Sequence, residues 1–287
     1  MEISFKASQS FVLRDGWIQK AFIEMKQHPG VNVFSKKDGV VYLGVGSNMV
    51  TSIKYWLDAS GVIEQTPTKV SGLSELGSFI DKYDPFLESS LSWQLIHMQL
   101  ARNFESAPLF WILFNVLSAG ESFTKESFVE DTISYLESRG ITANQQYIED
   151  DFGVLVRSYI SAGKSDPEDN MDCPLSTLAL LKQTGRGQFR KAAMPLEMLD
   201  PRVVFYLTKS IVGKKDSATF DDIVSMKEGP CKIFNLDRTT LMSVFMTLDN
   251  MGLVKVTRTA GLNTVYFNRK NYRLKELFED VMGGSAK

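Results

Sequence analysis

A glycine-rich run is the part of this chain best suited to bind an anion. Within Leu43–Trp56, glycines at positions 44 and 46 precede Ser47 and Asn48, and the apolar residues that follow recur at helical spacing. Ser47 or Asn48 can cap such a helix. A helix N-terminus presents unpaired backbone N–H groups and the positive end of the helix dipole, which favour a phosphate. The run predicts a DNA-phosphate contact at Gly46, Ser47 and Asn48; the alternative is an ordinary capped core helix.

Three cations are placed to accompany this contact. Lys54 follows Ser47 by seven residues, which is two helical turns, so both share a helix face. Arg14 and Lys20 flank the preceding predicted helix, whose Trp17 is expected to pack inward. We therefore predict a basic surface formed by Arg14, Lys20 and Lys54.

The C-terminal quarter carries a second pattern that points to DNA. Amphipathic segments at 201–212 and 220–227 precede a helix at 238–251 that Asp237 can cap, and alternating strands then flank the turn 260–263. This order predicts a winged helix, in which the third helix enters the major groove and the hairpin touches the DNA backbone. The predicted contacts are Arg238, Thr239, Thr240 and Ser243 on the helix, and Lys255 and Arg258 on the wing. Winged helices also serve as protein-interaction modules, and that alternative stays open.

A third basic segment lies at 182–191. It combines two glycines, four cations including Arg186 and Arg190, and Phe189. Such a segment can follow a phosphate backbone and stack a base. A solvated loop is the equally weighted alternative.

Catalytic residues and metal ligands cannot be assigned from the sequence. Acidic groups at 149–151, and at Glu168 and Asp169 with Asp172, could hold Mg²⁺ or Mn²⁺, or could be solvated helix ends. His97 lies within an apolar helical run and is predicted to be a core residue with satisfied hydrogen bonds. His28 is predicted to end a helix, and Cys173 to pack as a small hydrophobe.

The N-terminal motifs resemble those of the SspB-like family of bacterial DNA phosphorothioation and phage-defence loci, a family long of unknown function. The first shared motif is Arg-x-Gly-Trp-hydrophobic-x-Lys at 14–20, and the second is Leu-Gly-Val-Gly-x-Asn-Met-Val-x-Ser-Ile-x-Tyr-Trp at 43–56. A Cys-Pro-Leu segment at 173–175 also matches. The family often has His-Glu-Thr before the phenylalanine at 11, whereas this chain has Ser8-Gln9-Ser10.

The resemblance implies a DNA-binding component of a restriction-modification-like defence system that nicks DNA so that sulfur can be incorporated. It implies partnership with the sulfurtransferase-like and ATPase proteins of the locus. Because this chain lacks the family histidine, the resemblance implies no catalytic or metal-binding role at that position. A homodimer is one assembly that the sequence leaves open.

Composition sets broad limits. Of 287 residues, 44% are hydrophobic and 23% charged, and no apolar run approaches the ~20 residues of a membrane span. Two cysteines cannot form a disulfide framework, and we expect a cytoplasmic protein. The net charge is −2, yet residues 201–287 hold 14 Lys/Arg against 9 Asp/Glu, and residues 61–150 hold 5 against 13. Basic ends around an acidic middle suit polyanion contact by the ends.

The predicted fold is mostly α with small β elements and several subdomains. We expect helices at 16–27, 47–60, 89–103, 108–117, 124–139 and 144–162, a short strand at 40–43 and a turn-rich link at 61–74. Three domains follow: an N-terminal helix–strand–helix unit at 1–66, a helical middle at 67–200 and the winged helix at 201–287. Lys164–Asn170 is the best interior boundary.

Three functions compete. The first is a phosphorothioation component that nicks DNA with a divalent metal. The second is a non-catalytic winged-helix adaptor or transcription regulator, and the third is a protein-interaction scaffold of a defence complex.

Overall fold

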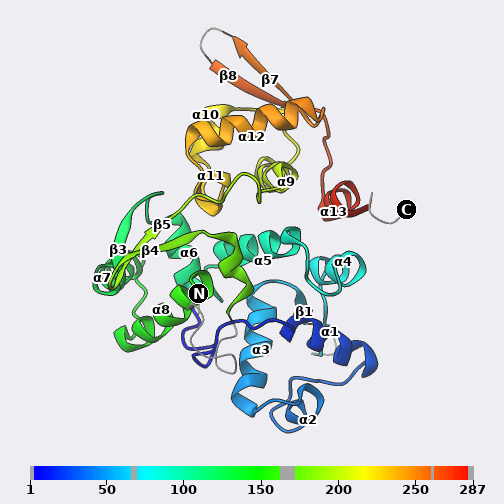
Figure 1. Cartoon of the computed structure of the whole chain (residues 1–287), viewed down its shortest axis with the longest axis vertical. Coiled ribbons are helices and arrows are strands. Elements are labelled where there is room, and N and C mark those ends of the chain that lie inside the picture. Colours follow the sequence, from blue (N-terminus) through cyan, green and yellow to red (C-terminus); the bar gives the residue numbers. More distant parts are fainter. Residues whose placement is uncertain (1–2, 66–69, 162–171, 260–261, 284–287) are drawn as a thin grey trace.

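A computed structural model describes residues 3–65, 70–161, 172–259 and 262–283. The chain is mostly α-helical with small antiparallel sheets, as predicted (Figure 1). The helices are α1 (Trp17–Gln27), α2 (Gly39–Leu43), α3 (Ser47–Ala59), α4 (Glu75–Tyr83), α5 (Ser90–Arg102), α6 (Pro108–Asn115), α7 (Lys125–Glu137), α8 (Gln145–Tyr159), the 3-10 helix η1 (Pro174–Leu178), α9 (Pro201–Val212), α10 (Phe220–Ser225), α11 (Pro230–Ile233), α12 (Arg238–Asn250) and α13 (Leu274–Met282). The strands are β1 (Ile63–Gln65), β2 (Ser71–Leu73), β3 (Ser122–Thr124), β4 (Leu181–Gly185), β5 (Gln188–Lys191), β6 (Ser217–Thr219), β7 (Val254–Thr259) and β8 (Leu262–Phe267).

The strand predicted at 40–43 is wrong, because these residues form the short helix α2. Gly39 lies against the Val33 carbonyl and the Val50 side chain, so the chain approaches too closely for a side chain at that position. Only Gly39 and Leu43 of α2 are buried, and Val41 is 81% exposed. The β-branched residues Val40 and Val41 therefore lie in a short helix and not in a sheet.

The predicted link 61–74 contains strands β1 and β2, which pair with each other. Helix α4 follows, capped by the Ser74 hydroxyl, which accepts from the Gly77 N–H at 3.0 Å. Gly77 lies directly under the Val62 carbonyl, where a Cβ would clash at 2.0 Å. The absent side chain lets α4 pack onto the start of β1. The sequence analysis missed this helix.

The predicted middle helices are confirmed as α5 to α8. Gly140 has φ of 70° and ends α7, and the Asn144 side chain caps α8 by accepting from the Gln146 N–H at 2.9 Å. Ala162 and the proposed boundary Lys164–Asn170 lie outside the described residues. The segment 182–191 is not a loop: it forms β4 and β5, which complete a sheet of order β3-β5-β4.

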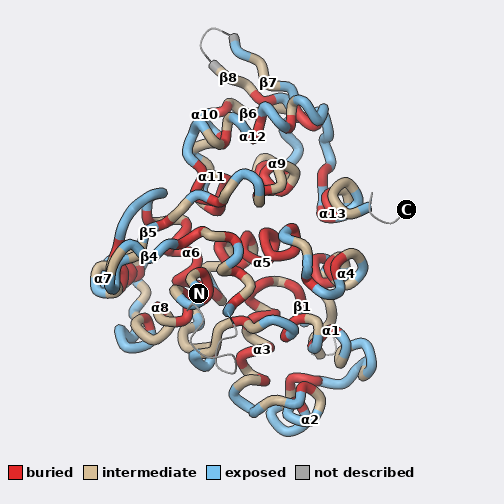
Figure 2. The backbone as a smooth tube through the Cα atoms, in the orientation of Figure 1, coloured by how far each residue is buried: buried red, intermediate tan, exposed pale blue. Residues whose placement is uncertain are grey.

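Helix α5 lies at the centre of the molecule. Ten of its thirteen residues are buried, and it packs against α6, η1, α9 and α11 (Figure 2). Three of the buried residues are polar: Ser92, Gln94 and His97. The His97 ring nitrogens lie 2.7 Å from the Tyr159 hydroxyl and 2.8 Å from the Ile233 carbonyl, so the prediction of a satisfied core histidine is confirmed.

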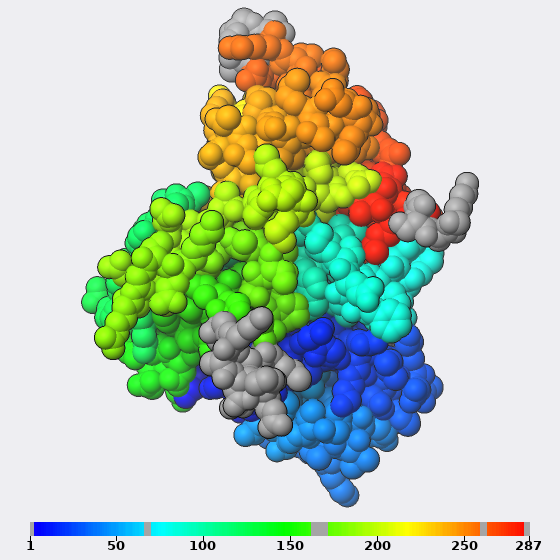
Figure 3. Space-filling view, in the orientation of Figure 1, coloured from blue at the N-terminus to red at the C-terminus, as the bar shows by residue number. Residues whose placement is uncertain are grey.

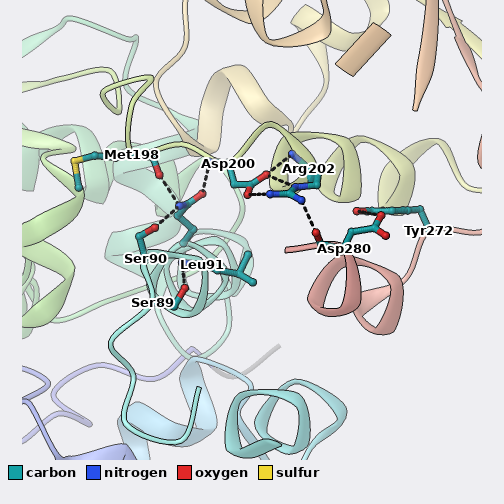
Figure 4. Close-up of polar contacts among 9 residues, drawn as sticks. Ser89, Ser90, Leu91, Met198, Asp200, Arg202, Tyr272 and Asp280 are labelled. Atoms are coloured by element: carbon teal, nitrogen blue, oxygen red, sulfur yellow. Dashed lines mark hydrogen bonds and ion pairs between the residues drawn. The ribbon is translucent and has the colours of Figure 1, made fainter. Parts of the chain in front are cut away.

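Gln94 is another buried polar residue of α5, and it holds the segment that leads into α9. Its amide nitrogen donates to the Met198 carbonyl at 2.8 Å, and its amide oxygen accepts from the Asp200 N–H at 3.3 Å. Asp200 then caps α9 and pairs with Arg202, whose guanidinium reaches the Asp280 carbonyl at 2.5 Å (Figure 4). One polar network therefore connects α5, α9 and α13.

Helix α13 returns to the middle of the molecule after the last strand. It packs against α4 and α9, and Phe278 stacks on Phe79 and Tyr83 of α4 at ring distances of 5.5 and 5.7 Å. The sequence analysis did not predict this helix. Within the described residues, no helix has both the length and the apolar character needed to cross a bilayer.

Cys173 and His28 also lie as predicted. Cys173 is fully buried, and burial raises the pKa of its thiol to about 12, so the thiol stays protonated. His28 is the C-terminal capping residue of α1.

The buried imidazole makes stability depend on pH. Burial lowers the pKa of His97 to about 4, so the folded protein holds this ring neutral where an unfolded chain, with a pKa near 6.5, would protonate it. Unfolding then takes up a proton, and His97 costs stability as the pH falls from about 6.5 to about 4. The loss is on the order of 3 kcal/mol.

We expect His97→Gln to reduce this acid sensitivity, because the glutamine amide can hydrogen-bond at the same place and does not titrate. Urea unfolding at several pH values between 6.5 and 4 measures the slope. Equal slopes in the wild type and the variant would contradict the assignment, whatever the difference in absolute stability.

Candidate nucleic-acid interfaces

The glycine run forms the turn between α2 and α3. Gly44 is left-handed, with φ of 58°, and Gly46 is the residue before α3. The prediction that Ser47 or Asn48 caps this helix is wrong. Both lie inside the first turn and are exposed, and within the described residues no side chain caps the end at Gly46. An uncapped first turn leaves its N–H groups facing solvent.

The three predicted cations of this surface differ in their contacts. The Lys20 ammonium lies beside the turn, 3.5 Å from the position of a Cβ on Gly44. Lys54 pairs with Asp58 at 3.0 Å, one helical turn further along α3. The Arg14 guanidinium lies over the Phe11 and Trp17 rings, 5.7 Å from each. Of these three described cations, Lys20 is the one whose charge lies against the glycine turn.

The basic hairpin β4–β5 keeps three of its four cations at the surface, and Lys182 on β4 is one of them. Arg186 lies in the turn and Arg190 on β5, both exposed. Phe189 instead packs on Phe123 and Phe152, with ring centroids 5.9 and 5.8 Å away, so it belongs to an internal aromatic cluster. Lys191 is buried and donates to the Leu117 carbonyl at 2.8 Å. Base stacking on Phe189 stays a prediction, and these ring contacts already occupy part of the half-buried side chain.

Helix α12 begins as predicted. The Asp237 carboxylate accepts from the Thr240 N–H at 2.7 Å, and Thr239 and Ser243 lie exposed on the first turns, with Thr240 half-buried. Arg238 is exposed, pairs with Asp221 and lies 5.2 Å from the centre of the Phe220 ring.

The hairpin β7–β8 projects beyond α12 (Figures 1 and 3). Lys255 and Arg258 on β7 are exposed, and Lys255 lies 3.3 Å from Asp249 of α12. The register places Lys255 opposite Tyr266, whose side chain is 47% exposed. The sequence analysis missed Tyr266, although the alternation along β8 would have placed it on the outer face. The turn residues Ala260 and Gly261 lie outside the described part of the chain.

The predicted contacts thus form separate groups. The glycine turn between α2 and α3 lies at one end of the long axis and β7–β8 at the other, with β4–β5 at the side (Figure 1). The structure does not bring these groups together into one surface.

The acidic residues proposed as metal ligands are also separated by their partners. Glu149 pairs with Lys125 at 3.0 Å and Asp150 with Lys6 at 2.6 Å. Asp151 accepts from the Lys6 N–H at 2.8 Å, and burial raises its pKa to about 6. Among the residues that the structure describes, no three His, Cys, Asp or Glu side chains form a group able to hold a metal ion. Glu168 and Asp169 lie outside those residues.

Comparison with known proteins identifies the family. A family model described as "Protein of unknown function (DUF4007)" matches residues 5–281, so the chain belongs to this family. No curated protein matches the chain.

Two solved structures share the fold. An SspB crystal structure is 19% identical, with 99% of this chain and 94% of that chain covered and a TM-score of 0.79. A magnesium ion-bound SspB crystal structure is also 19% identical, with 92% and 83% covered and a TM-score of 0.78. The SspB-like fold expected from the N-terminal motifs is therefore confirmed.

Asn48→Asp tests the phosphate contact at the start of α3. A carboxylate in the first turn suits the helix dipole, so folding stability should be preserved. If the amides there hold a phosphate, the added charge should weaken DNA binding about fivefold, from ~1 kcal/mol of repulsion at short range in water. Fluorescence anisotropy with labelled DNA measures this, with Asn48→Ser as the neutral control. A stable Asn48→Asp protein with unchanged affinity would leave Gly44 and Gly46 as structural glycines.

Proposed function

We propose that this protein is a DNA-binding component of a bacterial DNA phosphorothioation defence system, and that it binds duplex DNA through a C-terminal winged helix. The order α9, β6, α10, α11, α12, β7, β8 and the sheet order β6-β8-β7 carry the proposal. A helix, a short strand, a two-helix turn and a wing hairpin that pairs back onto the short strand are the parts of a winged helix. The assignment to a phosphorothioation system is supported by the fold that this chain shares with the SspB structures.

Helix α12 would enter the major groove. Its buried face consists of Leu241, Val244, Phe245 and Leu248, which leaves Thr239 and Ser243 on the outer face. Hydroxyl side chains at the N-terminal end of such a helix can hydrogen-bond base edges. Arg238 would exchange its partner Asp221 for DNA, at small cost because an exposed ion pair contributes only ~0–1 kcal/mol.

The wing would contact the phosphate backbone. Lys255 and Arg258 project from β7, and Tyr266 lies beside Lys255 on the outer face of the sheet. Lys255 and Arg258 supply positive charge, and Tyr266 supplies a hydroxyl group, which suits contact with the phosphate backbone.

The N-terminal group would act as a separate contact. Gly46, Ser47 and Asn48 with Lys20 form an uncapped helix start beside one cation, at the end of the molecule opposite the wing. Two contacts at opposite ends would let one molecule bind two DNA segments, or one DNA segment and a partner protein. The partners implied are the sulfurtransferase-like and ATPase proteins of the locus.

Strand nicking with Mg²⁺ or Mn²⁺ is part of the first proposal, and a non-catalytic adaptor is the second. One relative of the same fold is magnesium ion-bound. The ion pairs of Glu149 with Lys125 and of Asp150 with Lys6 favour the adaptor, because they give structural roles to two of the carboxylates that the sequence suggested as metal ligands.

Duplex binding by the full-length protein should depend on salt and on the wing. We expect affinity to fall by tenfold or more between 50 and 200 mM salt, because several phosphate contacts release counterions. Lys255→Ala should weaken all sequences alike, whereas Arg238→Ala should relax any base preference by about 1–3 kcal/mol. Labelled duplexes of differing sequence, titrated at each salt concentration, measure both effects.

Lys36→Ala supplies the control, since Lys36 is an exposed cation near α2. Affinity that is indifferent to salt, or equal losses of preference from Arg238→Ala and Lys255→Ala, would contradict the groove-and-wing arrangement.

Nicking should require a divalent metal. Supercoiled plasmid incubated with the protein and Mg²⁺ or Mn²⁺ should relax slowly, and EDTA should stop the reaction. Full nicking in EDTA would contradict metal dependence. An absence of nicking even with the partner proteins present would select the adaptor.

A further inference from the structure

A hollow of about 470 Å³ opens where the middle helices meet the C-terminal region. Its walls come from the residues after α5, from α6, from the end of α7 and from the turn between α10 and α11. The volume lies within the range of small-molecule sites. None of the residues predicted from the sequence to bind DNA lines it.

Three aromatic rings form the apolar wall of this hollow. Trp111 lies 4.9 Å from Phe104 and 5.6 Å from Tyr135, measured between ring centroids. Trp111 is buried, whereas Phe104 and Tyr135 are half-buried. A planar ring that enters the hollow would therefore meet the faces or edges of aromatic side chains, the contacts by which proteins hold single-stranded bases.

Two cations stand at the rim, and both are exposed. The Arg139 guanidinium lies 4.8 Å from the centre of the Tyr135 ring, and the Lys227 ammonium lies 5.4 Å from that of Trp111. They come from chain segments about ninety residues apart, yet both lie over rings of the same wall. If a ligand stacks on these rings, Arg139 and Lys227 lie close enough to bind an anionic group that it carries.

Glu228 is the acidic residue of the lining, and its carboxylate is directed to the protein. One oxygen accepts from the Trp111 indole N–H at 2.7 Å, and the other lies 3.9 Å from Arg102 Nε. Its backbone is left-handed, with φ of 55°, a conformation that a non-glycine residue adopts at a local cost. The strained turn places Lys227 and Glu228 together at the hollow.

We propose that this hollow binds one nucleotide, with the base stacked on the aromatic wall and the phosphate held by Arg139 and Lys227. Aromatic faces combined with flanking cations are the features that recognise a base and its phosphate. The nucleotide belongs to single-stranded DNA or is free in solution. This site is distinct from the proposed duplex surface on α12 and the wing, so it goes beyond the proposed function.

Variants of the full-length protein test the site. Tyr135→Ala removes a stacking ring and should weaken binding of a labelled 12-nucleotide single strand about tenfold. Arg139→Gln removes the charge and should also weaken it, with a smaller dependence on salt. The matched controls are Tyr147→Ala, a half-exposed tyrosine on α8, and Lys36→Gln. Thermal unfolding checks each fold, and the exposed Arg139 keeps the test valid if Tyr135→Ala fails to fold.

These measurements distinguish a free nucleotide from single-stranded DNA as the ligand. They also distinguish this nucleotide site from the proposed duplex surface. Deoxyadenosine monophosphate that displaces the strand and quenches tryptophan fluorescence identifies a free-nucleotide site, whereas strand binding that the mononucleotide does not displace identifies a single-strand site. No binding of either probe, or equal affinity in Tyr135→Ala, Arg139→Gln and the controls, overturns the proposal. Duplex binding should be unchanged in both pocket variants, so failure at the pocket is distinguishable from failure at the wing.

Discussion

Two buried polar side chains on α5 determine how the rest of the chain is placed. Gln94 bonds to Met198 and Asp200, and His97 bonds to Tyr159 and Ile233. Buried polar groups are costly when left unpaired, so each of these partners must be present in the folded state. One helix thereby specifies the positions of α8, of the segment entering α9 and of α11. The neutral state of His97 follows from the same burial.

The C-terminal elements are held by further contacts of the same kind. Arg202 pairs with Asp200 and donates to the Asp280 carbonyl, while the Asp280 carboxylate accepts from Arg269 and Tyr272. Helix α13 lies beside α4 (Figure 1), and its Phe278 stacks on Phe79 of α4. These contacts attach the region from α9 to β8 to the middle helices. The outer faces of α12 and of the wing remain exposed to solvent. If those faces bind DNA, the contacts with the middle helices would hold the DNA in a fixed position relative to the rest of the protein.

The sequence allowed most helices to be predicted and few of the tertiary contacts. The helical spacing of apolar residues located α5 to α9 and α12 within a few residues, because each of these helices is long enough to show the repeat several times. It failed at α2, where a run of β-branched residues suggested a strand; the close approach of Gly39 to Val33 and Val50 is a tertiary constraint that no local pattern shows. Helices α4 and α13 were missed, and they pack against each other.

The same is true of the candidate sites: the sequence predicted which residues are exposed, but not which contacts they make with other elements. Exposure of Thr239, Ser243, Lys255 and Arg258 followed from helix and strand spacing. The pairing of Lys54 with Asp58 and the packing of Phe189 on other rings depend on how neighbouring elements fold together, so spacing alone could not decide whether those residues were available. The aromatic hollow draws its lining from segments as distant as Phe104 and Lys227, and no motif marks it.

The central claim is that α12 and the hairpin β7–β8 hold duplex DNA. Crosslinking of a duplex that carries photoreactive bases to the full-length protein, followed by peptide identification, tests it most directly. The account predicts crosslinked peptides from residues 238–258, diminished by Lys255→Ala. Crosslinks confined to other parts of the chain, with none in α12 or β7, would contradict it.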